Sequence, residues 1–410
     1  MARGLAAVLT LAALVACDSG SADEGETEMG STGGSGSTAT QGPGEGATTN
    51  SPPSTSGPAD STGAGPQTSS DDGSTSDDPP DTETTIGEPD GVPVVVSLAH
   101  GGQTARSCDG GQTWSDFHEF GIQDDHSDYA AFGGLTFGNG AFVAATGWGA
   151  SGRILRSTDG VTWEDLPDDA FVTPKGVARP SNGASGVEFV GDGFVLFAGS
   201  HMWRSDDGST WTAESPETLS YSGHFREVEY LAEPGLLLIA MESYEVQQSW
   251  TIQVSADGGA TWQTGTGATA ECVGYVQHVG GFAAHDGRIL IGGGAGPTCV
   301  SDDGGLTWIG AGNLGSEIAD VASYDGGFVG LVQSGEVFAS ADGQAWTPLG
   351  NSGLDGGRLG WHPELGFFGE GGAVYAHSPD GATWTDAASQ PPKGYIHVRE
   401  FAVGGLPSCP

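Results

Sequence analysis

The hydrophobic residues of this chain fall in short segments that end in Gly, Asn or Asp. From residue 135 onward, apolar segments at 135–137, 142–146, 153–157 and 161–166 alternate with turn residues such as Asn139-Gly140. Short apolar segments bounded by turn residues are typical of β-strands, and no stretch of useful length shows the periodicity of an amphipathic helix. The pattern therefore predicts an all-β protein built from units of short strands. The same scheme returns at 187–189, 194–198 and 202–205, and its first segment returns at 228–230 and 321–324.

One motif, which we call the repeat turn, occurs once in each of these units. Its longer form is Ser-x-Asp-Gly-Gly-x-Thr-Trp; the shorter form lacks one residue, and Ala345 replaces Thr in one copy. Ser and Asp side chains hydrogen-bond nearby backbone N–H groups. Gly supplies positive φ, and Trp offers a large apolar surface for packing between units. The copies lie at 107–114, 157–163, 205–211, 255–262, 301–308, 340–346 and 378–384.

The repeat turn resembles the Asp-box, or BNR repeat, of sialidases and related β-propellers. The resemblance implies that each turn joins the third and fourth strands of a blade, on the face opposite the ligand site. We call the face with the repeat turns the lower face and the opposite one the upper face. The Trp residues of successive turns are 49, 48, 51, 46, 38 and 38 residues apart, spacings typical of propeller blades. We therefore expect a seven-bladed β-propeller.

The two ends of the propeller are expected to share one blade. Residues 94–98 already match a second strand that leads into the first repeat turn, so the first blade lacks an inner strand at its N-terminal end. Residues 397–403 match the inner-strand pattern. A C-terminal strand that joins the N-terminal blade would close the ring and remove exposed sheet edges, which invite aggregation.

The N-terminal region has the pattern of an export signal. Residues 1–17 contain Arg3 followed by an apolar run that is too short to span a bilayer. The sequence Leu14-Val15-Ala16-Cys17 resembles a bacterial lipobox, which implies cleavage before Cys17 and a lipid on its sulfur. An ordinary secretory signal with a chance Cys is the alternative. We expect a lipoprotein anchored in the bacterial cell envelope, periplasmic or at the cell surface, with the lipid as its only membrane contact.

Residues 18–91 form a linker by composition. They are rich in Ser, Thr, Gly and Pro, and hold 15 acidic residues but no Lys or Arg. Such a segment cannot bury enough apolar surface to fold, so we expect a disordered tether before a propeller domain at 92–410. The propeller region holds 38 acidic residues against 11 Lys and Arg, and the whole chain has a formal charge of -41. This balance argues against nucleic acid as a partner, because nucleic-acid binding depends on basic contacts to phosphate.

The cysteines suggest two disulfides. With Cys17 assigned to lipid, four Cys remain in an exported chain, an even number that favours pairing. Ring closure brings Cys108, in a repeat turn, near Cys409, just past the closing strand. We therefore prefer Cys108–Cys409 with Cys272–Cys299 over the other two connectivities.

The upper-face loops carry the least repetitive residues, as binding loops on a rigid scaffold do. Glycoside hydrolysis needs two carboxylates that flank the bond, and the acidic candidates by location are Asp124, Asp125, Asp128, Glu317 and Asp320. Several candidates would surround the central channel. The ligand-binding candidates are His126, Arg179, His224, Arg226, Arg358, His397 and Arg399.

The sequence favours binding over catalysis. The sialidase family has an Arg in a Phe/Tyr-Arg-Ile-Pro motif near its N-terminus and six blades, whereas this chain has only the echo Val177-Ala178-Arg179-Pro180 and seven turns. The histidines lack metal-ligand spacing, and we expect no metal or cofactor. We expect a monomeric binding or scaffold module for a glycan or protein ligand on the upper face. A glycoside hydrolase that uses the upper-face acids is the alternative.

Overall fold

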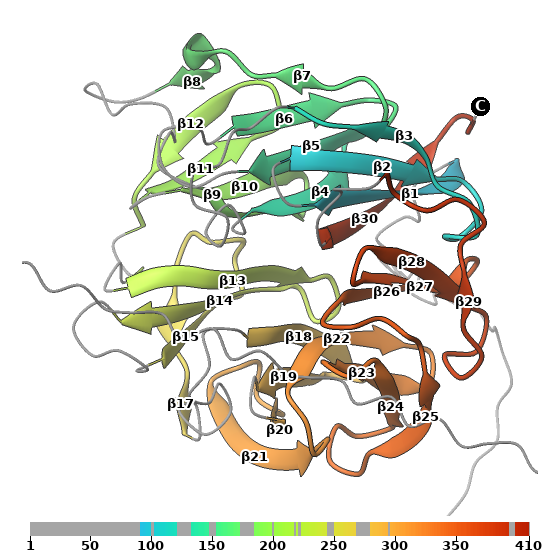
Figure 1. Cartoon of the computed structure of the whole chain (residues 1–410). Helices are drawn as coiled ribbons and strands as arrows, with labels where there is room; N and C mark the ends of the chain where they lie inside the picture. The colour runs from blue at the N-terminus through green and yellow to red at the C-terminus, as the bar shows by residue number, and fades with distance from the viewer. Residues whose placement is uncertain are drawn as a thin grey trace, which may run out of the picture. The chain divides into compact units, whose positions relative to one another are not determined.

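The computed structural model describes most of the propeller region (Figure 1). The described residues are 91–99, 102–120, 133–146, 153–172, 184–198, 201–216, 219, 223–243, 250–267, 279–293, 296–392 and 398–409. Within these ranges, no helix is long and apolar enough to cross a membrane. The predicted signal peptide, lipid site and linker lie outside them, except for Gly91 at the end of the linker.

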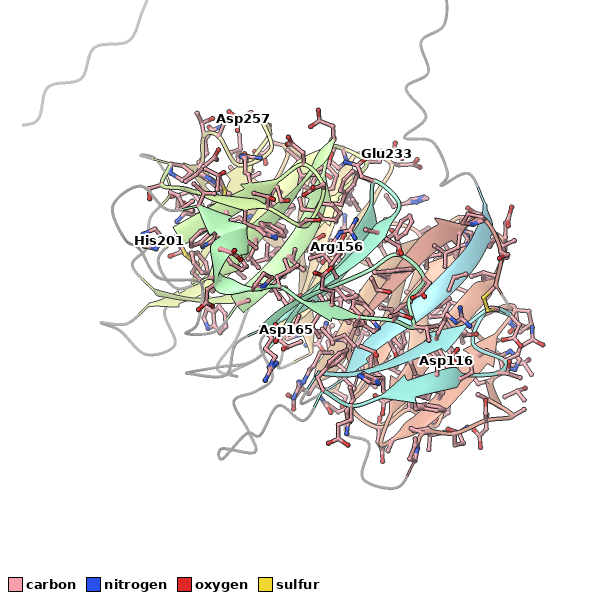
Figure 2. The ribbon with its side chains drawn as sticks, turned by 90° about the horizontal axis from the view of Figure 1, so that it is seen from above. Asp116, Arg156, Asp165, His201, Glu233 and Asp257 are labelled. Carbon is pink, nitrogen blue, oxygen red and sulfur yellow. A yellow bond between two sulfur atoms is a disulfide. The ribbon has the colours of Figure 1, made fainter. Side chains whose placement is uncertain are left out.

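The fold is a seven-bladed β-propeller, as the sequence predicts. Each blade contains four antiparallel strands that follow chain order from the innermost to the outermost, except in the blade that holds both ends of the propeller. In two blades a short additional strand, Phe171–Val172 or Thr266–Gly267, pairs parallel with the outermost of these four. In each blade, the connections between the first and second strands and between the third and fourth strands lie at one end of the strands. The connection between the second and third strands and the connection to the next blade lie at the opposite end. Figure 2 shows Asp257 of a repeat turn and Glu233 of a first hairpin on one side, and His201, which begins a third strand, away from them.

The strands of the first three blades are β1 (Val92–Ala99), β2 (Gln103–Ser107), β3 (Ser115–His118) and β30 (Val398–Leu406); β4 (Gly134–Gly138), β5 (Ala141–Thr146), β6 (Arg153–Ser157) and β7 (Glu164–Asp165); and β8 (Phe171–Val172), β9 (Ala184–Val190), β10 (Gly193–Ala198), β11 (His201–Ser205) and β12 (Trp211–Glu214).

The fourth and fifth blades contain β13 (Gly223–Leu231), β14 (Leu236–Ser243), β15 (Trp250–Ser255) and β16 (Gln263–Thr264); and β17 (Thr266–Gly267), β18 (Val279–His285), β19 (Arg288–Gly293), β20 (Pro297–Ser301) and β21 (Thr307–Asn313). The last two blades contain β22 (Ile318–Tyr324), β23 (Gly327–Val332), β24 (Glu336–Ser340) and β25 (Thr347–Asn351); and β26 (Arg358–His362), β27 (Gly366–Gly371), β28 (Val374–Ser378) and β29 (Thr385–Asp386).

The ring closes as predicted. β30 pairs antiparallel with β1 over its length, from Val92 opposite Leu406 to Ala99 opposite Val398. A Cys108–Cys409 disulfide, with the two Cα atoms 5.9 Å apart, joins the first repeat turn to the chain just after β30. Cys299 is buried and disulfide-bonded; Cys272 lies outside the described residues, so the second predicted pair stays a prediction.

Each repeat turn is fixed by its own side chains. In the turn at 255–262, Ser255 Oγ donates to Asp257 Oδ1 at 2.7 Å and accepts the Gly259 N–H at 2.7 Å. The Thr261 N–H donates to Asp257 Oδ1 at 2.8 Å. Gly259 has φ of 93°, a conformation that favours glycine. Asp side chains that accept these bonds are held ionised, and the pKa of every repeat-turn Asp is lowered.

The Trp of each repeat turn packs between two blades. The described core divides into hydrophobic clusters, and each holds one repeat-turn Trp together with residues of the preceding blade. Trp262 of the fourth blade, for example, lies against Phe197 of the third, with ring centroids 5.9 Å apart. A single blade cannot bury its apolar face alone, so burial of these Trp side chains between neighbouring blades stabilises the ring.

Arginines link neighbouring blades on the lower face. Each donates from a β-strand to a backbone carbonyl in the repeat turn of the next blade. The pairs are Arg106 with Asp159, Arg156 with Asp207, Arg204 with Gly258 and Arg288 with Asp342.

Candidate functional site: the polar central channel

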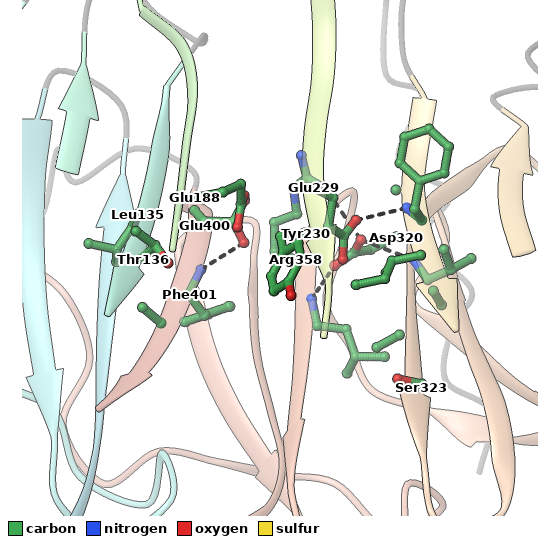
Figure 3. A pocket seen from close by; sticks show the side chains of 18 of the residues that line it. Leu135, Thr136, Glu188, Glu229, Tyr230, Asp320, Ser323, Arg358, Glu400 and Phe401 are labelled. Carbon is green, nitrogen blue, oxygen red and sulfur yellow. Dashed lines mark hydrogen bonds and ion pairs between the residues drawn. The ribbon is translucent and has the colours of Figure 1, made fainter. Parts of the chain in front are cut away.

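The inner strands of all seven blades surround a pocket of about 360 Å³. These strands are β4, β9, β13, β18, β22, β26 and β30. The sheets pack face to face, so the inner strand is the edge of each sheet that borders the ring centre, and residues of every inner strand line the pocket. The pocket is rich in carboxylates and also contains Arg358 (Figure 3).

A recurring contact joins successive inner strands across the gap between blades. The inner strands of neighbouring blades do not pair with one another, so side-chain oxygens accept some of their N–H groups. Glu229 Oε2 accepts the Phe282 N–H at 3.0 Å, and Asp320 Oδ2 accepts the Leu359 N–H at 2.7 Å. In the same way, Thr136 accepts the Phe189 N–H and Glu188 accepts the Tyr230 N–H. Glu370, on the second strand of the seventh blade, accepts the Val398 N–H.

Arg358 is ion-paired with two carboxylates inside the channel. Its Nη1 lies 3.2 Å from Asp320 Oδ1, and its Nη2 lies 3.6 Å from Glu227 Oε2. Burial raises the pKa of Asp320 and of Glu227, and the charge of Arg358 acts against that rise. Burial disfavours the charged guanidinium as well, but Glu227 and Asp320 outweigh it and raise the pKa of Arg358. Arg358 therefore neutralises part of the acidic channel.

The remaining channel acids hold protons more tightly than exposed carboxylates do. Burial raises the pKa of Glu188 and of Glu229 well above the usual value, and neighbouring carboxylates act in the same direction. Burial also raises the pKa of Glu400 to about 8, despite the opposing charge of Arg358. The pKa of Glu370, which is 1% exposed, rises to about 7 for the same reason. Glu400 is therefore mostly protonated at neutral pH, and Glu370 takes up its proton as the pH falls through about 7.

Arg399 differs from Arg358. It is the second residue of β30, at the upper end of that strand. Burial lowers the pKa of Arg399, and the positive charge of Arg358 adds to the effect, whereas Glu370 and Glu227 oppose it. Its Nε is buried and has no hydrogen-bond partner.

The structure brings three predicted site residues together and leaves the others apart or outside its description. Asp320 and Arg358 line the pocket, and Arg399 lies beside it. However, Asp320 and Arg358 lie in β22 and β26 and not on loops. Glu317 lies in the loop before β22, half-buried, where its carbonyl accepts the Gln333 N–H.

The other candidates fall outside the described part of the chain. His224 and Arg226 belong to β13, but their side chains are not described. The remaining ones are Asp124, Asp125, His126, Asp128, Arg179 and His397.

Sequence reasoning missed the inner-strand acids Glu188, Glu227, Glu229 and Glu400. The available signal was a charged residue within a short apolar strand, as in Val187-Glu188-Phe189 and Val228-Glu229-Tyr230. In a propeller, such a residue on the first strand of a blade points into the channel. A charged residue at such a position therefore indicates a side chain that lines the channel and not one on a solvent-exposed strand face.

The chemistry of the channel is constrained by these contacts. Asp320 and Glu227 pair with Arg358, while Glu188 and Glu229 accept N–H groups of the next blade. A hydrolase needs one carboxylic acid and one carboxylate that reach the substrate. These four channel acids are occupied within the scaffold, whereas Glu400 accepts, among the described residues, only the N–H of the next residue, Phe401. No three of the described His, Cys, Asp and Glu residues form a group suited to a metal ion.

Comparison with known proteins finds similarity in structure alone. No protein-family model matches the chain, and no curated protein matches its sequence. A structure of YCF48 bound to D1 peptide is 16% identical, with a TM-score of 0.47 over 72% of this chain and 89% of that one. YCF48 from Cyanidioschyzon merolae is 17% identical, with a TM-score of 0.47 over 71% and 91% of the two chains. The GH74 xyloglucanase from Xanthomonas campestris is 13% identical, with a TM-score of 0.43 over 78% and 53%. Similarity at this level carries no information about activity.

Proposed function

We propose that this protein is an exported binding module of the Asp-box propeller type, which holds a protein partner on its upper face. In this proposal, a lipid on Cys17 anchors the chain and residues 18–91 hold the propeller away from the membrane. The propeller acts as a rigid monomeric frame for the upper-face loops.

The proposal rests on one observation: the described carboxylates of the channel other than Glu400 are engaged in holding the frame together. Asp320 accepts a neighbouring blade's N–H at 2.7 Å and pairs with Arg358 at 3.2 Å. Glu229 accepts another at 3.0 Å. Polar groups used in this way stabilise a scaffold and leave no obvious catalytic pair among the described residues.

The charge of the chain favours a protein over a neutral glycan as the ligand. The formal charge of -41 creates a field that attracts a partner with basic groups, and a neutral glycan gains nothing from it.

Glycoside hydrolysis remains the second candidate because of one specific observation. Glu400 has a pKa of about 8, so it is protonated at neutral pH, as a general acid must be. Its contacts argue against this role: Glu400 Oε1 accepts the Phe401 N–H at 3.3 Å, and Glu227 beside it pairs with Arg358. A catalytic partner for Glu400 would have to come from the upper-face loops.

A parallel screen separates these functions. The full-length chain in detergent is presented to a random-peptide display library and to a glycan array, and is incubated with a panel of fluorogenic glycosides. We expect related peptide sequences with basic residues to be enriched, with no fluorophore release. Binding to glycans without peptide enrichment would contradict the protein-partner proposal, and turnover that is lost in Glu400→Gln would establish the hydrolase.

A further inference from the structure

The use of basic side chains in this acidic protein singles out one residue. Arg106, Arg156, Arg204 and Arg288 hold repeat-turn carbonyls of the next blade, Arg153 pairs with Asp165, and Arg358 pairs with Asp320 and Glu227. Among the arginine side chains that the structure describes, Arg399 alone has neither a hydrogen bond nor an ion pair.

Nearby carboxylates do not neutralise Arg399 by direct contact. Glu370 is close enough for its charge to act on Arg399, but both of its oxygens are occupied. Oε1 accepts the Ala373 N–H at 2.8 Å, and Oε2 accepts the Val398 N–H at 2.7 Å. Glu227, the other acid that acts on Arg399, pairs with Arg358. A partly buried charge without an ion-pair partner destabilises the folded protein. An external anion that pairs with Arg399 would reduce this destabilisation.

The position of Arg399 suits a ligand that arrives from the upper face. It lies at the start of β30, and the next residue, Glu400, lines the channel. Of its three side-chain nitrogens, only Nε is both buried and without a partner. The two Nη atoms therefore keep access to solvent. A guanidinium in this state can donate two parallel hydrogen bonds to one planar anion.

We propose that Arg399 is a carboxylate-binding residue on the upper face, and that it takes a carboxylate of a peptide that is otherwise neutral or basic. The planar carboxylate matches the guanidinium fork. The acids around the channel would repel a polyanion such as a nucleic acid or a sulfated glycan, but a single carboxylate next to basic groups meets favourable charges on both sides. The choice of a peptide rests on the proposed protein partner, whereas the carboxylate chemistry does not.

The first test needs no natural partner. The buried Nε–H of Arg399 is observed by NMR in the full-length chain and is assigned by its loss in Arg399→Lys. It is then titrated, at constant ionic strength, with N-acetylglycine for a terminal carboxylate, N-acetyl-aspartate amide for a side-chain carboxylate, and N-acetylglycine amide as the neutral control.

We expect the Nε–H signal to shift with one or both carboxylates in the millimolar range and not with the amide; the stronger probe identifies the source. No shift with either carboxylate would overturn the proposal. D-glucuronic acid is added as a further probe, and a shift with this sugar acid alone would overturn the choice of a peptide.

The second test uses peptides selected on the full-length chain. Arg399→Gln should weaken peptide binding about 10-fold or more, since a charge-assisted hydrogen bond contributes roughly 1.5–3 kcal/mol. Amidation of the peptide carboxylate should have the same effect on the parent and none on the variant. Arg153→Gln is the matched control, because Arg153 also begins a strand at the upper edge but pairs with Asp165.

The outcomes distinguish the two proposals. Equal peptide affinity of Arg399→Gln and the parent would refute the role of Arg399 while the binding function stands. Failure to select any peptide would refute the protein-partner proposal, and the NMR titration would still decide whether Arg399 binds carboxylates.

Discussion

Replacement of Arg358 by Gln tests the account of the channel. Arg358 holds Asp320 at 3.2 Å and Glu227 at 3.6 Å, and Asp320 is only 6% exposed. Loss of one partner of a buried ion pair leaves an uncompensated charge, which typically costs about 3–5 kcal/mol. We therefore expect Arg358→Gln to lower the free energy of unfolding by about that amount at pH 8.

The loss should depend on pH. Burial raises the pKa of Asp320 and of Glu227, and Arg358 limits that rise in the parent. In the variant, both pKa values rise further, so the acids take up protons at a higher pH than in the parent. Because protonated acids no longer need the guanidinium, the difference in stability between parent and variant should shrink as the pH falls from 8 towards 5.

Urea unfolding of both proteins at pH 8 and pH 5 measures this difference. Arg153→Gln is the control, since its exposed ion pair with Asp165 should contribute less than about 1 kcal/mol. A loss below about 1 kcal/mol for Arg358→Gln at pH 8 would refute the channel role. An equal loss at the two pH values would refute its electrostatic origin.

Other predictions concern the frame and the anchor. Trp262→Ala should cost about 3–5 kcal/mol in urea unfolding, because it leaves a cavity between two blades; a variant as stable as the parent would disprove the packing role. For Glu370, a pKa that rises from 4.5 to about 7 gives stability that is full below pH 4.5 and is lost as the pH rises through about 7. The thermal midpoint should therefore rise from pH 8 to pH 5 and fall again once the repeat-turn aspartates are protonated; a midpoint that is flat from pH 8 to pH 5 would contradict the raised pKa values. Removal of residues 395–410 should expose the edge of β1 and cause aggregation, visible by light scattering. A soluble truncated protein with an unchanged melting curve would show that the ring does not depend on β30. Cys17→Ala should move the protein out of the membrane fraction, and its retention there with normal processing would rule out the lipid anchor.

The fold was predictable because its signal is repeated. Each repeat turn contains its own hydrogen-bond partners, such as Ser255 and Asp257, so a local sequence fixes a local structure. The Trp spacing then gives the number of blades. Closure by β30 followed from the missing inner strand of the first blade, and it placed Cys108 near Cys409, where the structure has a disulfide.

The candidate site was predictable only in part, because its contacts are non-local. Asp320 and Arg358 are 38 residues apart in the sequence, and no local pattern in either segment predicts their ion pair. Glu188 and Glu229 lie in short apolar strands, and only the arrangement of the whole ring turns them towards the channel. The unpaired state of Arg399 depends on how Glu370, in another blade, uses its oxygens. Sequence patterns report local repeats well and such long-range polar contacts poorly.

The most direct test of the proposed function is hydrogen–deuterium exchange of the full-length chain with and without a selected peptide. We expect slower exchange in upper-face connections such as 314–317, 333–335 and 352–357, and unchanged exchange in repeat turns such as 255–262. Protection of the repeat turns, with the upper-face connections unchanged, would show that the partner binds the opposite face and would contradict the account.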